Sequence, residues 1–265
     1  LLEKVVNEVT QEGGENEVTL LGRGGVIAAN LQVGADVTAC RPLRANDNLS
    51  NNGVILGGKG FEVDESIARQ LGLESVELSR KHIRRYMGGS SLTSKFEESF
   101  VLDLFGLTSQ TVEQNLPEIY QWLHTNVRPK RLQNKRKTRR ENWWLFNENV
   151  PKLRSMLAGL QRYIGTTETA KHRIFSFIDG DVLPDHMVIS IATNDPIYLS
   201  ILSSRIHVTW ALANGGTLED RPRYNKTRCF ETFPFPALEE GPLKDRLSDL
   251  GERLDAHRKR QQALH

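Results

Sequence analysis

The sequence contains few of the features that mark membrane or secreted proteins. Only two of its 265 residues are cysteines, Cys40 and Cys229, and they lie far apart. Such a pair favours free thiols in a reducing compartment over a disulfide framework. No apolar run approaches the roughly 18 residues of a membrane span, and none follows an N-terminal charge as in a signal peptide. We therefore expect a cytoplasmic protein without a membrane partner, folded as one or two domains with a buried core.

Net charge is also small, at +2, but the charges are unevenly distributed. Residues 1–79 hold 12 Asp/Glu and 6 Lys/Arg, whereas residues 127–173 hold 13 Lys/Arg and 3 Asp/Glu. Eight of the thirteen positions in residues 128–140 are basic, and Trp143-Trp144 follows them as a hydrophobic anchor. This polarity indicates a cationic face directed at a polyanion. A flexible, solvated charged surface is the alternative.

Hydrophobic patterning predicts an α+β fold, with mixed sheets, packed helices and a C-terminal helical extension. A hairpin is expected where residues 18–21 and 26–29 flank a Gly-rich turn. Asp64 and Gly72 bound a short helix, Thr108 or Ser109 begins one that runs to about 125, and Asp195-Pro196 begins one that runs to Ala213. Strands are expected at residues 100–105, 162–165, 174–178 and 187–192, and a polar loop at 43–53. In the tail, a leucine seam at Leu243, Leu247, Leu250 and Leu254 predicts a helix that packs on another part of a larger protein or on itself.

The segment from Arg221 to Pro236, RPRYNKTRCFETFPFP, combines basic, hydroxyl and aromatic residues with a proline-locked end. It cannot continue a helix, because Pro234 and Pro236 fix φ and lack N–H donors. Its polar side chains suit the recognition of base edges and phosphates in DNA.

This segment and several others resemble the target-recognition domain of MmeI-like (type IIG/IIL) restriction–modification proteins. The further motifs are VLDLFGL at 101–107, WWLF at 143–146, TAKHR at 169–173 and LSSRIH at 202–207. These proteins are DNA adenine-N6 methyltransferases, many with a nuclease, that act in phage defence. The resemblance covers roughly residues 40–238. It implies a hairpin or linker at 1–40 after a catalytic domain that is not in this chain, a target-recognition domain at 41–240, and a C-terminal helix at 241–265.

The resemblance also implies that the chain recognises a specific double-stranded DNA sequence and adjoins a methyltransferase domain that binds S-adenosylmethionine. The chain itself contains neither the Asn/Asp-Pro-Pro-aromatic loop for a flipped adenine nor a Gly-rich cofactor turn after a strand. Gly57-Gly58-Lys59-Gly60 lacks the dinucleotide-binding spacing and is interpreted as a tight turn. We therefore expect no catalytic centre, metal or cofactor in this chain.

Glu219 and Arg221 are the predicted base-contacting pair. Arginine matches the O6 and N7 acceptors of guanine, glutamate accepts from cytosine N4, and the resembled family has its specificity pair at the matching positions. A surface salt bridge is the alternative. The residues predicted to contact phosphates or to position this loop are Arg136, Lys137, Arg139, Arg140, Lys171, His172, Arg173, Arg205, Arg223, Tyr224, Asn225, Lys226 and Thr227.

Two other classes of function remain open from the residues alone. Asp179, Asp185 and His186 cluster as in a small metal-dependent nuclease, although no acid-x-Lys triplet follows them. A protein-interaction module of a phage-defence complex is the third possibility, and it predicts no affinity for DNA.

Overall fold

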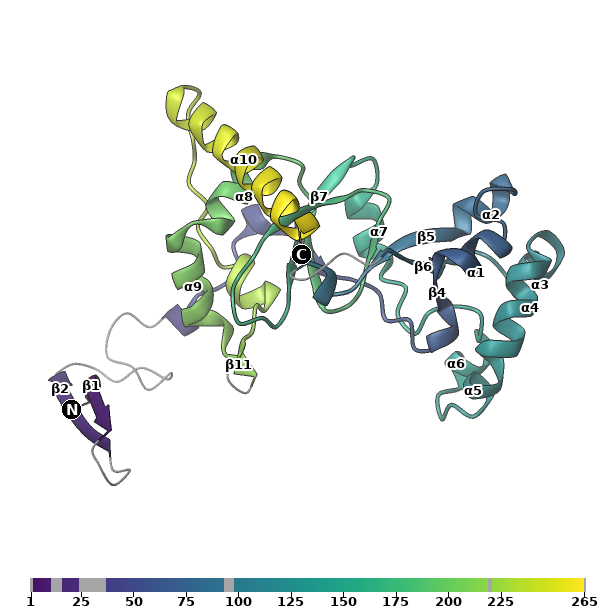
Figure 1. Cartoon of the computed structure of the whole chain (residues 1–265), viewed down its shortest axis with the longest axis horizontal. Coiled ribbons are helices and arrows are strands. Elements are labelled where there is room, and N and C mark those ends of the chain that lie inside the picture. The colour runs from purple at the N-terminus through teal and green to yellow at the C-terminus, as the bar shows by residue number, and fades with distance from the viewer. Residues whose placement is uncertain (1, 11–15, 24–36, 93–97, 219–220, 265) are drawn as a thin grey trace.

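The structure is a computed structural model that describes residues 2–10, 16–23, 37–92, 98–218 and 221–264 (Figure 1). It has two lobes, each built around its own four-stranded sheet. The sheets are mixed or antiparallel and helices pack on both, so the α+β prediction is confirmed. None of the described helices has the length and apolar composition needed to cross a bilayer.

The first lobe contains the sheet β4-β6-β5-β9 and the helices α1 to α6. Strand β5 pairs in parallel with β9, while the other neighbours are antiparallel. The bounds of these strands are β4 Glu62–Val63, β5 Ile83–Met87, β6 Ser99–Leu102 and β9 Leu183–Pro184. The helices are α1 Glu65–Gln70, α2 Glu77–His82, α3 Ser109–Asn115, α4 Pro117–Asn126, α5 Arg128–Leu132 and α6 Lys137–Glu141. The side chains of Phe61, Leu102, Ile119 and Leu123 are fully buried in the core of this lobe.

The second lobe contains the antiparallel sheet β3-β10-β7-β8 and the helices α8 to α10. Its strands are β3 Ser50–Asn52, β7 Arg162–Thr167, β8 Ser176–Asp179 and β10 Val188–Ile191. Its other elements are α7 Pro151–Leu157 near the junction, α8 Pro196–Ser203, α9 Arg205–Gly215, the two-residue strands β11 Thr217–Leu218 and β12 Arg221–Pro222, and a π-helical turn at Lys226–Phe230. Short 3-10 turns lie at Val37–Ala39, Arg44–Asn46, Lys59–Phe61 and Ser90–Leu92. All four predicted strands are confirmed in part of their range: 100–105 overlaps β6, and 162–165, 174–178 and 187–192 overlap β7, β8 and β10. The polar segment 43–53, expected as a loop, supplies β3.

Two helices that the hydrophobic periodicity predicts as single elements are each broken. The first breaks where Leu116 leaves helical geometry, with φ −137° and ψ 56°, and Pro117 begins α4. The second breaks at Ser204, whose side chain caps α9 by accepting from the His207 amide. The break turns Ile206 outward, and it is 76% exposed rather than buried as expected. The predicted caps Asp64, Thr108 and Asp195 are confirmed.

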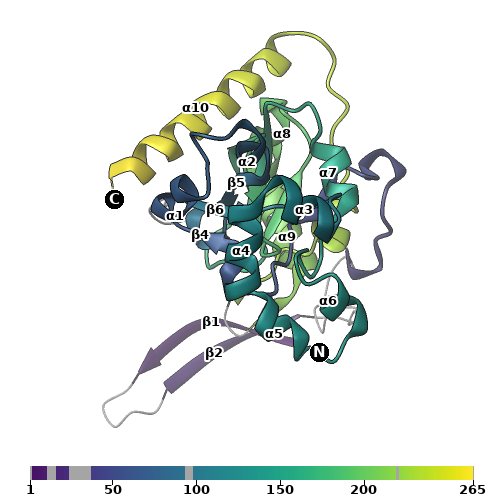
Figure 2. The same ribbon diagram turned by 90° about the vertical axis from the view of Figure 1, so that its right-hand side faces the viewer.

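The C-terminal helix α10 (Pro242–Leu264) packs along α8 of the same chain (Figure 2). The contact is closest at Gly251, where a Cβ atom would lie 2.1 Å from the carbonyl oxygen of Pro196. Leu243 is 64% and Leu250 42% exposed, whereas Leu247 and Leu254 are half-buried, so only part of the predicted leucine seam contributes to the packing face. The face centred on Gly251 and Asp255 docks on the second lobe of the same chain. Packing of the exposed leucines on another segment of a larger protein stays a prediction.

The N-terminal hairpin pairs β1 (Leu2–Thr10) with β2 (Asn16–Arg23) and lies apart from the two lobes in Figure 1. The predicted strand at 18–21 is confirmed, but its partner is the segment 4–8, which carries no clear strand signal in the sequence. The expected partner strand at 26–29 lies outside the described residues.

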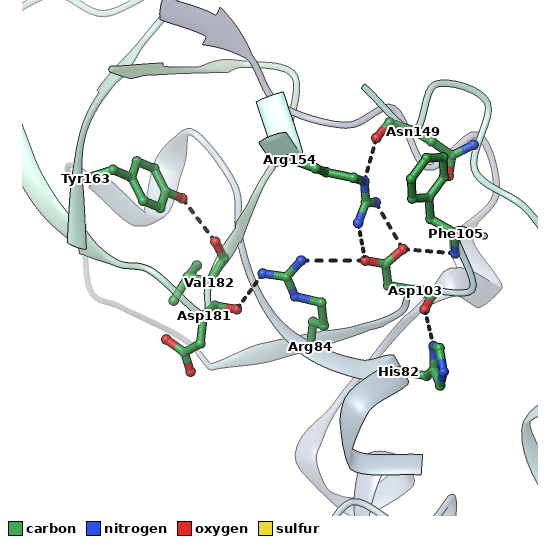
Figure 3. A network of polar contacts seen from close by, with 9 residues as sticks. All are labelled: His82, Arg84, Asp103, Phe105, Asn149, Arg154, Tyr163, Asp181 and Val182. Atoms are coloured by element: carbon green, nitrogen blue, oxygen red, sulfur yellow. Dashed lines mark hydrogen bonds and ion pairs between the residues drawn. The ribbon is translucent and has the colours of Figure 1, made fainter. Parts of the chain in front are cut away.

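The junction between the lobes is built on Asp103, whose side chain is 5% exposed (Figure 3). Arg154 of α7 donates to both carboxylate oxygens, and Arg84 of β5 lies 3.7 Å from one of them. The Asp103 carbonyl oxygen lies 2.9 Å from Nδ1 of His82. The Asp103 carboxylate also accepts from the Phe105 amide. The conspicuous VLDLFGL motif therefore contains the central acid of the junction.

Both arginines of this network also bind backbone carbonyl groups. Arg154 Nε donates to Asn149 O at 2.7 Å, and Arg84 donates to Asp181 O at 3.1 Å. The buried Tyr163 of β7 donates to Val182 O at 3.1 Å (Figure 3). The second sheet therefore binds the segment Asp181-Val182 that Arg84 of the first sheet also binds. These contacts hold the two sheets at a fixed separation and set the geometry of the surface between them.

Candidate nucleic-acid interface

The β11–β12 hairpin is tethered to the second sheet through the residues that follow β12. The Arg223 guanidinium binds Glu168 Oε1, with Nε at 2.6 Å, and Arg223 also forms a β-bridge with Thr169. The next amide, of Tyr224, donates to Glu168 O at 2.6 Å. Just before β11, the last residue of α9, Gly215, packs closely against the backbone of Arg223, because a Cβ atom at Gly215 would lie 2.1 Å from Arg223 O. The base of the hairpin is thus fixed, and Leu218 and Arg221 on its two strands are exposed.

Beside this hairpin lies a groove of about 900 Å³ between the two lobes. Lys171, His172 and Arg221 line it from the second lobe, and all three are exposed. The first lobe contributes Tyr86 and the Gly88-Gly89-Ser90 segment. The structure therefore brings together three of the predicted site residues from two separate motifs, with positive charge on one wall.

Tyr224, predicted to help position the loop on the duplex, is fully buried. Its hydroxyl lies 3.0 Å from Nε2 of His207, which is also fully buried, and both rings pack against Phe175. Burial, together with the nearby Arg173 charge, lowers the pKa of His207 to about 3, and burial raises the pKa of Tyr224. Tyr224 therefore anchors the segment Arg221–Pro236 in the core of the second lobe and cannot touch a ligand.

Arg173 also has an internal role rather than the predicted phosphate contact. Its guanidinium donates to Pro222 O at 3.1 Å, to Thr166 Oγ1 at 3.2 Å and to the carbonyl oxygen of Thr167, and it lies 5.0 Å from the Tyr224 ring centroid. Burial lowers the pKa of this side chain. Its donors are used to attach strand β12 to the sheet, which explains why this cation does not face the groove with Lys171 and His172.

Residues 225–227 form a tight turn whose polar groups partly satisfy one another. Asn225 Oδ1 accepts from the amide of Thr227 at 3.0 Å and from its hydroxyl at 2.6 Å. Lys226 lies 3.7 Å from Glu231 and is half-buried, whereas Thr227 is exposed. Arg205, at the start of α9, is exposed as well. Glu219 lies outside the described residues.

The predicted cationic segment forms α5, α6 and their connection on the first lobe. In Figure 1 these helices and β11 lie on the lower side of the molecule, on different lobes. Arg136 and Lys137 are exposed, while Arg140 is half-buried and donates to Asn134 O and Lys135 O at 2.7 and 3.0 Å. Arg139 is also half-buried.

Trp143 and Trp144 anchor this segment, as predicted. Trp143 is 7% exposed, and Trp144 Nε1 donates to Leu107 O at 2.9 Å. Sequence patterns did not reveal that Arg131, in the middle of the basic run, is buried, with only 3% of its surface exposed. The basic run is therefore a supported surface and not a flexible tail.

The three residues of the nuclease alternative do not converge. Asp179 pairs with Arg85 at 3.0 Å, and Asp185 accepts from the Tyr86 hydroxyl at 2.6 Å and lies 2.9 Å from His186 Nδ1. Within the described part of the chain, no group of three or more His, Cys, Asp or Glu residues is arranged to hold a metal ion. The two carboxylates instead bind side chains of β5, at the junction of the lobes. Cys40 is exposed and Cys229 buried, both as free thiols, as predicted.

The fold and this surface define a two-lobed α+β domain with a short β11–β12 hairpin on the second lobe and a basic segment on the first. The family model for the MmeI target recognition domain matches residues 41–237, and the chain belongs to this family.

Two comparisons agree with this assignment. A solved structure of the type IIL restriction-modification enzyme MmeI in complex with DNA superposes with a TM-score of 0.66 at 21% identity, covering 95% of this chain and 33% of that one. DNA methyltransferase A of Bacillus subtilis (strain 168) is 36% identical over 58 residues, which are 22% of this chain and 7% of that protein. The chain thus corresponds to about a third of the solved enzyme and is similar to only a small part of the methyltransferase.

Proposed function

We propose that this chain recognises a specific double-stranded DNA sequence as the target-recognition domain of a cytoplasmic DNA adenine-N6 methyltransferase in a restriction–modification system. Family membership over residues 41–237 is the observation that carries the proposal. The parent protein would supply the methyltransferase domain, its S-adenosylmethionine and any nuclease. In this division, residues 1–40 connect to the catalytic part, 41–240 recognise the DNA, and 241–265 form a supporting helix.

Base recognition is assigned to the tip of the β11–β12 hairpin. Arg221 lines the groove beside the hairpin and presents a planar donor fork suited to guanine O6 and N7. Glu219, two residues earlier, offers only acceptors when ionised and suits cytosine N4. The fixed base of the hairpin supports this assignment, because Glu168 and Arg173 hold Arg223 and Pro222 while Arg221 is exposed.

Phosphate contacts are assigned to cations on both lobes. Lys171 and His172 lie in the groove, Arg205 is exposed on α9, and Arg136 and Lys137 are exposed on the first lobe. Cations on both lobes allow the duplex to be held at more than one place, so that base contacts are made in one register. Arg139, Arg140, Arg223, Asn225, Lys226 and Thr227 are assigned to shaping and positioning this surface.

Selection of bound duplexes from a random pool by the isolated chain tests the proposal. We expect enrichment of one defined sequence containing an adenine, without dependence on divalent metal. Failure to retain any duplex would favour a protein-interaction module, and metal-dependent cleavage would favour a nuclease. Either result would overturn the proposed function.

A further inference from the structure

A small pocket on the first lobe is lined by cations from two separate segments. The turn at Gly57-Gly58-Lys59 forms one wall, and α5 with its flanks forms the other through Lys130 and Arg131. The pocket has a volume of about 260 Å³, below the range of roughly 300–1,000 Å³ for drug-sized ligands. Its lining contains no Asp or Glu among the described residues. Its size suits a single ionic group, and its charge suits an anion.

Arg131 is the unusual member of this pocket. It is 97% buried, since only 3% of its surface is exposed, and no ion pair among the described residues includes it. Its terminal nitrogens donate to Leu56 O at 3.0 Å, to Leu145 O at 2.8 Å and to the side-chain oxygen of Asn147. Its Nε atom is buried without a hydrogen-bond partner. A buried guanidinium whose hydrogen-bond partners are all neutral leaves positive charge uncompensated.

The electrostatic surroundings of Arg131 increase this excess. Burial, and secondarily the positive charge of Arg139, lower the pKa of Arg131 to about 10, so it remains charged at neutral pH. Lys59 and Lys130 are exposed at the pocket, and neither forms an ion pair among the described residues. A bound anion would supply the countercharge that the protein lacks here.

The shape of the turn keeps the pocket in place. Gly57 has φ +72°, and a Cβ atom at this position would lie 2.0 Å from the side-chain nitrogen of Asn147, the same residue that accepts from Arg131. A Cβ atom at Gly60 would lie 2.8 Å from that of Asn126. Glycine is therefore required at both positions for the turn to lie against α4 and α5. The Gly-rich turn, interpreted from sequence as a tight turn only, positions Lys59 opposite Lys130.

We propose that this pocket binds a phosphate group of the DNA backbone, with Lys59 and Lys130 in direct contact and Arg131 supplying buried positive charge behind them. The inference rests on the proposed function for the identity of the ligand as DNA, but the site is defined by its own chemistry. A phosphate seated here would fix the register of the duplex on the first lobe while the hairpin of the second lobe contacts bases.

Two measurements test the proposal with the variant Lys59→Gln/Lys130→Gln and the control Lys81→Gln/Lys152→Gln, which removes equal charge from exposed positions outside the pocket lining. The first is the salt dependence of duplex binding. Loss of one phosphate contact lowers the log–log slope by about 0.9, so the variant should lose roughly three- to fourfold less affinity than wild type between about 50 and about 200 mM salt. Sequence preference should not change.

The second measurement uses inorganic phosphate alone and does not require DNA binding. Millimolar phosphate should raise the Tm of the wild type and of the control above that in chloride of equal ionic strength, and the pocket variant should lose this increase. If phosphate protects all three proteins equally, no site exists here. Protection of the wild type with an unchanged salt slope in the variant would show a free-phosphate site and overturn the DNA contact. If the wild type binds no duplex at all, the proposed function fails, and the phosphate response still decides whether the pocket binds this anion.

Discussion

Arg154 and Asp103 form a two-point ion pair at the junction of the lobes, with N–O distances of 2.6 and 3.0 Å. Both partners are largely buried, with 16% and 5% of the side chains exposed, and the Arg154 guanidinium also covers the ring of Phe105 at 4.7 Å. The pair connects the end of β6 to α7, and therefore one sheet to the segment that leads to the other.

We expect Asp103→Asn to lower the free energy of unfolding by about 3–5 kcal/mol, because it removes one partner and leaves Arg154 buried without its countercharge. Urea denaturation measures the change. The control Glu239→Gln removes an exposed carboxylate that has no ion pair among the described residues and should change stability by less than about 0.5 kcal/mol. A similarly small effect of Asp103→Asn would show that the junction does not depend on this pair.

The charge exchange Glu219→Lys with Arg221→Asp should move the preference at one base pair from C·G to G·C. Each good contact contributes about 1–3 kcal/mol of discrimination, so the affected position should change by tenfold or more while the others stay fixed. Binding-site selection with the double variant measures this. Retention of the original preference at every position would assign the hairpin to phosphate contacts only.

Replacing Arg136 and Lys137 by alanine should weaken binding to all duplex sequences about equally and lower the log–log salt slope by roughly one unit per lost phosphate contact. The wider variant that also replaces Arg139 and Arg140 should have the same character, with an added loss of stability. Arg140 holds the Asn134 and Lys135 carbonyl groups, and its removal disturbs the turn before α6. A changed sequence preference in the double variant would mean that these residues contact bases.

Stability should fall as pH is lowered, because the folded state holds His207 neutral. Its pKa is about 3 in the folded protein and about 6.5 in the unfolded chain, so the unfolded state binds the extra proton between these values. The free energy of unfolding should therefore decrease by about 2 kcal/mol from this residue between about pH 7 and about pH 5. His207→Gln, which can still pair with Tyr224, should reduce the pH dependence by this amount in urea titrations. An unchanged pH dependence would contradict a neutral, buried His207.

Gly251→Ala should destabilise the protein, although the same change on an exposed helix stabilises by about 0.5–1 kcal/mol. The added methyl group would lie 2.1 Å from Pro196 O, so α10 must move away from α8. His257→Ala, at an exposed position of the same helix, is the control and should be neutral or slightly stabilising.

Removal of all residues from 241 onward should reduce stability and solubility while leaving the sequence preference intact. A lower Tm for Gly251→Ala but not for His257→Ala supports the packing, and an altered base preference in the truncated chain would contradict it.

Local chemistry in the sequence predicted the elements whose signals are short and unambiguous. Asp195-Pro196 defined the start of α8, and Asp64 with Gly72 defined α1, because caps and chain-reversing glycines act within a few residues. The breaks at Pro117 and Ser204 were missed, since the hydrophobic period continues through both. At such sites a cap competes with helix continuation, and tertiary packing decides between them.

Burial of polar residues was the other source of error. Tyr224 and Arg173 belong to motifs that resemble a DNA-binding family, but the first lies in the core and the second attaches β12 to the sheet. Arg131 is buried within a segment in which eight of thirteen residues are basic. A sequence displays the charge of such side chains but not their neighbours, and long-range contacts, such as that between Arg131 and Leu56 O, decide which cation faces solvent.

The C-terminal helix has a further consequence for the sheet beneath it. Strand β8 is the last strand of its sheet, and α10 binds the backbone next to it, because Asp255 accepts from the Phe177 amide at 2.8 Å and Arg258 donates to Phe175 O. Side chains of a helix thus occupy hydrogen-bonding groups that a neighbouring strand would otherwise use. An uncovered edge strand promotes strand addition and aggregation. The helix therefore protects this edge of the sheet from pairing with strands of other chains.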